Sequence, residues 1–163
     1  MNKKISILIP VYNEVSTIKD CIENILKFNF HEFEKEIIVS DNNSNDGTIE
    51  ILKNINYPEV KILYKDINEG KGSNLKNALK HASGDLVIFQ DGDLEYSPDN
   101  YDDLLHPFEK YQADVVFGSR LTGAKVTKIM GFPNLIANKL ITLCVNILFN
   151  RIFTDVETGH KVF

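Results

Sequence analysis

Short apolar runs alternate with longer amphipathic segments along most of the chain. Five runs have the length and composition of buried strands; they are Ile5–Ile9, Glu36–Ser40, Val60–Tyr64, Asp85–Phe89 and Asp114–Phe117. Between and after these runs, apolar residues recur every three or four positions, which predicts helices that bury one face. These helices are expected at about residues 15–28, 47–55, 70–82, 101–111 and 135–149.

Strands that alternate with helices at this spacing predict an α/β fold with a mainly parallel sheet and helices on both faces. Pro10 is expected to end the first strand. Ligands of such sheets bind beyond the carboxyl ends of the strands. Each predicted strand is followed by a polar or glycine-rich segment; the segments are 10–14, 41–44, 68–72, 91–93 and 118–120. Five such segments at one sheet edge indicate a cleft that binds a nucleotide.

The segment Gln90-Asp91-Gly92-Asp93-Leu94-Glu95 is the most informative of these strand exits. Alternating carboxylates at the ligand edge suit a hard divalent cation such as Mg²⁺ or Mn²⁺, which takes one or two carboxylates together with phosphate oxygens. Gly92 lets the backbone approach a ligand closely. The alternative interpretation is an acidic turn exposed to solvent.

Two further strand exits carry candidate ligand groups. Asp41 ends the second strand, where a carboxylate can accept a hydrogen bond from a nucleobase or a ribose hydroxyl. Ser44 or Asp46 is expected to cap the helix that follows. The segment Gly70-Lys71-Gly72 lacks the glycine spacing of the P-loop and of dinucleotide-binding folds, so it either starts a helix or lies near a sugar nucleotide.

Taken in order, these segments resemble the motifs of a known enzyme family. Residues 9–14, 41–48, 68–72 and 91–98 look like the successive motifs of family 2 glycosyltransferases, which have the GT-A fold. Within that family, Gly118-Ser119-Arg120 and the segment 154–161 most resemble the polyprenyl-phosphate branch, which is similar to dolichol-phosphate mannose synthase. The resemblance covers nearly the whole chain.

The resemblance implies roles for individual residues. The nucleoside pocket is expected to be lined by Pro10, Tyr12, Glu14, Val39 and Asp41, with Lys71 near the sugar nucleotide. Asp91 and Gly92 are expected to contact the ribose and diphosphate, Asp93 and Glu95 to hold the metal, and Arg120 to face the diphosphate or the acceptor phosphate. Asp155 is the candidate general base if the acceptor is a hydroxyl, because a hydroxyl acceptor needs deprotonation.

The sequence departs from the family pattern at three positions. Asn42 stands where a second acid is usual, and Asn43 where a glycine is usual. We expect the base pocket to survive, with an altered preference for base or donor. His160 replaces a more usual aromatic residue, and it is expected either to bind phosphate or to lie on the surface.

The implied function is an inverting, metal-dependent hexosyltransferase that uses a GDP- or UDP-sugar and a polyprenyl phosphate acceptor in cell-envelope or glycoconjugate synthesis. A sugar hydroxyl on a glycan is the alternative acceptor. A non-catalytic module that binds a nucleotide sugar is the alternative to an enzyme. A nucleotidyltransferase is disfavoured because Pro10–Glu14 replaces the glycine-rich, basic loop typical of that class.

The charge is unevenly distributed along the 163 residues. The formal net charge is −5, from 18 Lys and Arg against 23 Asp and Glu. Nucleic-acid-binding proteins are usually basic, so no such partner is expected. Residues 1–119 carry 12 Lys and 21 acids, a net −9, whereas residues 120–163 carry 6 Lys and Arg and 2 acids, a net +4. We expect residues 1–120 to form the nucleotide-sugar and metal-binding core, and residues 121–163 an acceptor- or membrane-proximal part of the same domain, incomplete by comparison with the family.

The expected helix at 135–149 is apolar except for one stripe, formed by Asn138, Lys139, Thr142 and Asn146. It either packs on the sheet or in a homodimer, or lies in the headgroup region of a bilayer. The basic residues around it suit an anionic lipid surface; they are Arg120, Lys125, Lys128, Lys139, Arg151 and Lys161.

Membrane insertion and disulfide bonding are not expected. No uncharged apolar window of about 18 residues predicts a membrane span, and the first residues do not match a signal peptide. A cytoplasmic protein, peripheral at the membrane, is therefore expected. Cys21 and Cys144 lie in apolar helical patterns, which predicts buried, reduced thiols.

Overall fold

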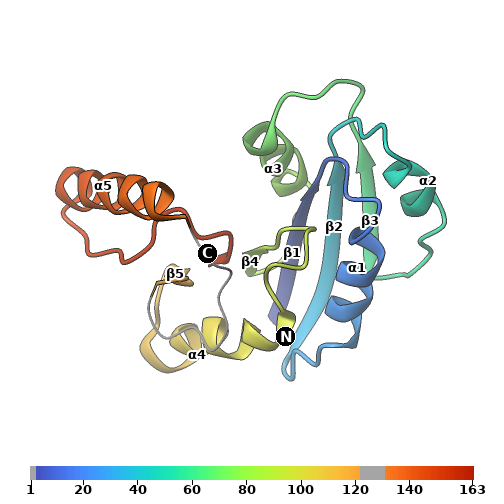
Figure 1. Ribbon diagram of the computed structural model, residues 1–163. Helices are drawn as coiled ribbons and strands as arrows, with labels where there is room; N and C mark the ends of the chain where they lie inside the picture. Colours follow the sequence, from blue (N-terminus) through green and yellow to red (C-terminus); the bar gives the residue numbers. More distant parts are fainter. Residues whose placement is uncertain (1–2, 122–130) are drawn as a thin grey trace.

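The computed structural model describes residues 3–121 and 131–163. It contains six strands, five α-helices and one short 3₁₀ helix in these residues (Figure 1). In chain order they are β1 (Lys3–Val11), α1 (Ile18–Lys27), β2 (Phe33–Asp41), α2 (Thr48–Lys53), β3 (Val60–Tyr64), α3 (Lys71–Leu79), β4 (Leu86–Phe89), η1 (Pro98–Asn100), α4 (Tyr101–Tyr111), β5 (Val116–Phe117), α5 (Phe132–Phe149) and β6 (Lys161–Val162). Lys125 and Lys128 lie outside the described residues.

The strands form one mainly parallel sheet in the order β3-β2-β1-β4-β6-β5. Strand β1 pairs in parallel with β2 and β4, and β2 with β3. Strand β6 is antiparallel to both β4 and β5, so β5 runs in the same direction as β4. The five predicted strands therefore all end at the same edge. The sequence did not predict β6, since two residues are too few to show a period.

Both faces of the central strand β1 are buried. Ile5, Ile7 and Ile9 face the main core, which includes α1 and α4. Leu8 faces a smaller cluster with Ala78 of α3. Helices α1 and α3 consequently cover opposite faces of the sheet, as the alternation of strands and helices predicted.

Strand β1 continues through Pro10 to Val11, so the prediction that Pro10 ends the strand is wrong. Pro10 pairs with Ser40 of β2. On the other side, β4 ends at Phe89 opposite Leu8, and Gln90 N donates to Leu8 O as the last bond on that side. The missing N–H of Pro10 falls one step beyond this bond, where no ladder hydrogen bond is lost.

Helix α5 lies away from the sheet (Figure 1). It starts at Phe132, three residues before the predicted start. By length and composition it is the one helix of the described residues able to cross a membrane, with a mean hydropathy of 1.4 and 11% of its residues buried. The sequence prediction, which required an uncharged window, excluded it because of Lys139.

Cys144 on this helix is exposed, contrary to prediction, whereas Cys21 on α1 is buried as predicted.

The carboxylate of Glu36 links β1, β2 and the segment before β4 at the amino-terminal edge of the sheet. Glu36 of β2 accepts hydrogen bonds from Ser6 Oγ (2.5 Å) and Ser83 N (2.6 Å), and its other oxygen pairs with Lys4 Nζ at 2.7 Å. Burial alone would raise the pKa of Glu36, but these hydrogen bonds outweigh it and lower the pKa from 4.5 to about 2. The charged form of Glu36 therefore stabilises the fold.

Replacement of Glu36 by Gln should destabilise the protein at neutral pH by about 2 kcal/mol. The folded-state pKa lies below the unfolded value, so the contribution is complete above about pH 4.5 and is lost as the pH falls toward about 2. Urea unfolding at pH 7 and pH 3 measures both effects. The free energies of unfolding of the unaltered protein and Glu36→Gln should differ less at pH 3 than at pH 7. Glu109→Gln, on the exposed face of α4, should leave the free energy of unfolding unchanged at both pH values. An equal difference between the unaltered protein and Glu36→Gln at both pH values would contradict this role of Glu36.

Candidate active site

Two adjoining cavities lie at the carboxyl edge of the sheet. The first, of about 270 Å³, is lined by Pro10, Val11, Tyr12, Glu14, Asn42, Asn68, Gly70, Lys71, Asn74, Asp91, Gly92 and Asp93. The second, of about 320 Å³, is lined by Lys71, Leu75, Phe89, Asp91, Glu95, Tyr96, Arg120, Glu157, Thr158, Gly159 and Lys161. Lys71 and Asp91 belong to both cavities, and Lys71 Nζ donates to Asp91 Oδ1 at 2.6 Å. This ion pair stands at the boundary between them.

The loop after β1 forms one wall of the first cavity, and the loop after β2 holds it in place. Asn13 N donates to Ser44 Oγ at 2.9 Å, and Glu14 N donates to Thr48 Oγ1 at 2.9 Å. The N-cap of α2 is Gly47, which has no capping side chain; Asp46, one residue earlier, accepts from Thr48 N at 3.0 Å. Neither predicted residue is therefore the N-cap itself: Asp46 binds the first N–H of the helix, and Ser44 binds the loop after β1.

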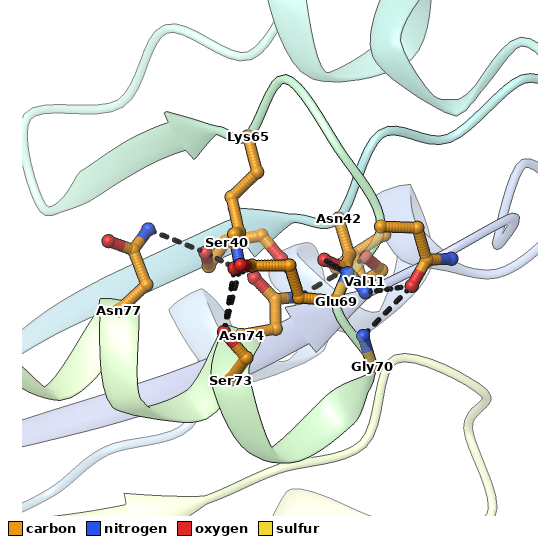
Figure 2. A network of polar contacts seen from close by, with 10 residues as sticks. Val11, Ser40, Asn42, Lys65, Glu69, Gly70, Ser73, Asn74 and Asn77 are labelled. Carbon is orange, nitrogen blue, oxygen red and sulfur yellow. Dashed lines mark hydrogen bonds and ion pairs between the residues drawn. The ribbon is translucent and has the colours of Figure 1, made fainter.

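A network of amides joins β1 and β2 to the loop before α3 (Figure 2). Asn42 accepts from Glu69 N at 3.2 Å and donates to Asn68 Oδ1 at 2.6 Å. Asn74 of α3 is 1% exposed and donates to Ser40 O at 2.6 Å. Uncharged Asn42 thus holds the loop that leads into α3 through both a donor and an acceptor, whereas a carboxylate at this position could only accept.

Asn43 has a left-handed backbone conformation, with φ 64°. This conformation is best tolerated by glycine and, among other residues, by asparagine. The departure from the usual glycine at position 43 is therefore compatible with the local backbone.

Two residues predicted for the nucleoside pocket lie behind its surface. Val39 is fully buried in the main hydrophobic core and lines neither cavity. Asp41 is also fully buried; its Oδ2 accepts from Ser44 N at 3.0 Å, and its Oδ1 is buried without a hydrogen-bond partner among the described residues. Asp41 Oδ1 is therefore an unused hydrogen-bond acceptor at the end of β2. Leaving such a buried oxygen unpaired costs about 1–3 kcal/mol of folding stability.

The acidic turn after β4 divides its carboxylates between the two cavities. Asp93 lines the first cavity, Glu95 lines the second, and Asp91 lines both. Leu94, between Asp93 and Glu95, has a left-handed backbone conformation with φ 61°, and Asp93 Oδ1 accepts from Glu95 N at 3.0 Å. Carboxylate oxygens are the donors that Mg²⁺ and Mn²⁺ prefer, so the turn fits such an ion. Among the described residues, no three His, Cys, Asp or Glu side chains are placed to hold a metal ion together, so a bound ion would need further oxygens from a ligand or water.

Gln90 holds both ends of this acidic turn. Its Nε2 donates to Asp91 O at 3.0 Å and to Tyr96 O at 3.1 Å. Its Oε1 accepts from Tyr101 O–H at 2.8 Å and lies 2.9 Å from His160 Nε2. Because Oε1 can only accept, this contact requires the proton of His160 to be on Nε2.

His160 is 3% exposed, so the surface prediction is wrong. His160 immediately precedes β6, and the pairing of this unpredicted strand places the His160 side chain in the interior. Its ring centroid lies 4.4 Å from that of Tyr96. Burial lowers the pKa of His160 from 6.5 to about 4, so the imidazole is neutral at pH 7 and is poorly suited to bind phosphate as a cation.

Arg120 and Asp155 form a bidentate ion pair. Arg120 Nε donates to Asp155 Oδ2 at 2.8 Å, and Nη2 donates to Oδ1 at 2.9 Å. Burial acts to raise the pKa of Asp155, but hydrogen bonds from Arg120 and Asn138 lower it to about 2; its bond with Asp155 raises the pKa of Arg120. Arg120 lines the second cavity, but Asp155 is 1% exposed and lines neither.

Gly159 packs closely against two side chains of the acidic turn. A Cβ atom at this position would lie 2.6 Å from both Asp91 Oδ2 and Tyr96 Cε2. Gly159→Ala should therefore displace the acidic turn and lower the melting temperature by several degrees, as about 1–3 kcal/mol of strain would. Differential scanning calorimetry measures this shift. Gly131→Ala is the matched control, since its Cβ would be 3.9 Å from the nearest atom of the described residues; equal melting temperatures for both variants would contradict the close packing.

Comparison with known proteins identifies the family. Residues 6–159 match the family described as glycosyl transferase family 2. The chain is 26% identical, over 179 aligned positions that include 99% of it, to the UDP-N-acetylglucosamine–dolichyl-phosphate N-acetylglucosaminyltransferase of Methanococcus voltae. It is 32% identical over 145 positions, 85% of the chain, to the dolichol-phosphate mannosyltransferase of Pyrococcus furiosus. The chain spans 70% of the first protein and 39% of the second.

The fold is also that of solved glycosyltransferases. The crystal structure of glucosyl-3-phosphoglycerate synthase from Mycobacterium tuberculosis, in complex with Mn²⁺, UDP-glucose and phosphoglyceric acid, superposes with a TM-score of 0.67 and 23% identity. The superposition covers 98% of this chain and 56% of the synthase. The sheet is therefore a GT-A sheet, and the chain belongs to glycosyl transferase family 2.

Proposed function

We propose that this chain binds a nucleotide-diphospho sugar in the first cavity and transfers its hexose, with inversion, to an acceptor in the second. One observation carries the proposal: the two cavities meet at Lys71 and Asp91, with Asp93 on one side and Glu95 on the other. A donor diphosphate at this boundary would place its sugar toward the second cavity. The matching family and the Methanococcus relative, named for a UDP-sugar donor, support this assignment.

The first cavity has the groups that a nucleoside needs. Tyr12 is 45% exposed and presents an aromatic surface, and Pro10 and Glu14 line the same wall. The unpaired Oδ1 of Asp41 would accept from a nucleobase N–H if the wall in front of it opened slightly. These groups would suit either uracil or guanine, so the donor is proposed as a UDP- or GDP-sugar.

Asp93 and Glu95 would hold a Mg²⁺ or Mn²⁺ ion together with the donor diphosphate. Such an ion, when bound, offsets the negative charge that develops on the departing nucleoside diphosphate. Lys71 lies close enough to Asp91 to add positive charge at the same point. The proposal of a metal is supported by the carboxylate donors of the turn, and the related synthase was crystallised with Mn²⁺.

The second cavity favours a phosphate acceptor over a hydroxyl acceptor. It is lined by three cationic side chains, those of Lys71, Arg120 and Lys161, and by the carboxylates of Asp91, Glu95 and Glu157. With the charge of the acidic turn offset by a metal ion, the three cations would be left to bind a phosphate. The predicted base for a hydroxyl acceptor, Asp155, is buried in its pair with Arg120 and has a pKa of about 2, so it is a poor proton acceptor near neutral pH. A lipid phosphate is already anionic and needs orientation rather than deprotonation. Two relatives named for dolichyl phosphate support a polyprenyl phosphate.

The reaction then follows from the two binding positions. A phosphate oxygen of the acceptor attacks the anomeric carbon from the face opposite the diphosphate. The bond between that carbon and the diphosphate oxygen breaks, and its electron pair leaves with the nucleoside diphosphate. Arg120 would orient the attacking phosphate, and the anomeric configuration inverts.

Helix α5 is proposed to contact the membrane that holds such an acceptor. Eight of its apolar side chains are 44–78% exposed; they are Phe132, Ile136, Leu140, Ile141, Leu143, Ile147, Leu148 and Phe149. Residues 120–163 carry a net charge of +4, which complements an anionic leaflet. The protein is accordingly proposed to be peripheral at the cytoplasmic face.

The donor site is tested by isothermal calorimetry of the protein with UDP- and GDP-sugars in the presence of Mn²⁺. Asp93→Ala should weaken binding of the sugar nucleotide at least tenfold while leaving the melting temperature nearly unchanged, because the residue is exposed. Asp102→Ala, which removes an equally exposed carboxylate from α4, should bind as the unaltered protein does. Unchanged affinity in Asp93→Ala would contradict the metal assignment.

Catalysis is tested by transfer to undecaprenyl or dolichyl phosphate. Formation of the glycosyl phosphate lipid supports the proposal. Binding of the sugar nucleotide without turnover on a lipid phosphate or a glycan would instead support the alternative of a non-catalytic binding module.

The membrane contact is tested by sedimentation with anionic phospholipid vesicles. Ile147→Glu together with Leu148→Glu should abolish co-sedimentation, because two charges would have to enter the apolar region. Tyr111→Glu on α4 is the control, since Tyr111 is 66% exposed on another surface. A stable dimer in the absence of lipid, broken by the same double substitution, would contradict membrane contact and assign the face to a second copy.

A further inference from the structure

Helix α5 turns its polar side inward. Asn138 is fully buried and Thr142 is 6% exposed, although both belong to the stripe that the sequence marks as polar. Asn146 on the same side clamps the backbone of Phe153, accepting from its N–H at 2.8 Å and donating to its O at 3.0 Å. Thr142 Oγ1 accepts from Val156 N at 3.3 Å. Asn146 and Thr142 therefore hold α5 against the segment 153–157, whereas Lys139, the fourth residue of the stripe, is exposed.

Asn138 differs from the other members of this stripe in its partners. Its Nδ2 donates to Asp155 Oδ1 at 2.8 Å and to Glu157 Oε2 at 3.1 Å. Thr142 and Asn146 hold backbone groups of the segment, but Asn138 holds two of its carboxylates. Glu157 lines the second cavity, and Asp155 lies directly behind it.

Asp155 passes this constraint on to Arg120. Its two oxygens accept from Arg120 N at 3.1 Å, Arg120 Nε at 2.8 Å and Arg120 Nη2 at 2.9 Å. The remaining hydrogen bond to Asp155 comes from Asn138. Without Asn138, the carboxylate would keep its partner Arg120 but would lose the only one of these bonds that ties it to α5. The orientation of the pair would then be free to change.

We propose that Asn138 is a positioning residue: through Asp155 it fixes the guanidinium of Arg120 at the wall of the second cavity, and α5 is thereby part of the acceptor site. The link rests on the geometry alone; only the phosphate that Arg120 receives rests on the function proposed above. A ligand or membrane bound to the apolar outer face of α5 would then affect the position of Arg120 through the contacts from Asn138 to Asp155 and from Asp155 to Arg120.

The link is tested by hydrogen exchange at the arginine Nε–H, followed by NMR in the full chain. The sequence contains two arginines, Arg120 and the exposed Arg151, so the spectral region holds two signals and Arg151 is an internal reference. Exchange of the Arg120 Nε–H should be slow in the unaltered protein and about tenfold faster in Asn138→Ala, the change expected for the loss of one hydrogen bond to a charged group.

Asn146→Ala is the matched control, because it loosens the same helix from the same segment without touching a carboxylate. It should leave the exchange of Arg120 close to that of the unaltered protein. Equal exchange rates in the unaltered protein and Asn138→Ala would overturn the proposal, and so would an equal acceleration in Asn138→Ala and Asn146→Ala, which would reduce Asn138 to a structural contact. If Asn138→Ala does not fold, Asn138→Ser keeps a small polar side chain that is too short to reach Asp155.

Titration with inorganic phosphate separates this inference from the proposed function. The Arg120 Nε–H signal should shift with phosphate in the unaltered protein, and Asn138→Ala should need several-fold more phosphate for the same shift, while its affinity for UDP or GDP with Mg²⁺ is unchanged. No response of Arg120 to phosphate in the unaltered protein would contradict the phosphate acceptor, while the exchange rates still decide the link. A fall in nucleotide affinity equal to that for phosphate would overturn a role specific to the second cavity.

Discussion

The candidate site depends on one constraint, the common direction of five strands. Because β1 to β5 all run the same way, every loop that follows one of them is delivered to the same edge of the sheet. The buried strand β1 lies at the centre and is enclosed by α1 and α3 on its two faces. An apolar framework thus holds the polar groups at this edge in place.

Antiparallel β6 completes the site from the opposite direction. It pairs with both β4 and β5, and the chain leading into it brings Gly159 against Asp91 and His160 against Gln90. The acidic turn is therefore fixed by its own strand and by the last segment of the described chain. This double support holds Asp93 and Glu95 on either side of the boundary between the cavities.

The sequence predicts the parts of this arrangement that repeat or that form continuous runs. The apolar runs of β1 to β5 locate the strands, and their polar exits place nine of the twelve predicted site residues on the two cavities; Val39, Asp41 and Asp155 instead lie buried behind the surface. Strand β6 has two residues and leaves no periodic signal, so the burial of His160 was missed. The polar stripe of α5 was recognised, but a stripe does not reveal which side faces the protein. Here it faces inward, because Asn138, Thr142 and Asn146 find polar partners in segment 153–157.

The roles proposed for the two cavities both depend on a metal ion bound at the acidic turn, and such an ion can be observed directly. Crystals of the protein soaked with MnCl₂ and UDP would give anomalous scattering at the manganese absorption edge. We expect a peak within coordination distance of Asp93 and Glu95, with the diphosphate next to it and the nucleoside in the first cavity. A nucleotide bound elsewhere, or bound in the first cavity with manganese away from both carboxylates, would contradict the division of the site into donor and acceptor cavities joined by a metal.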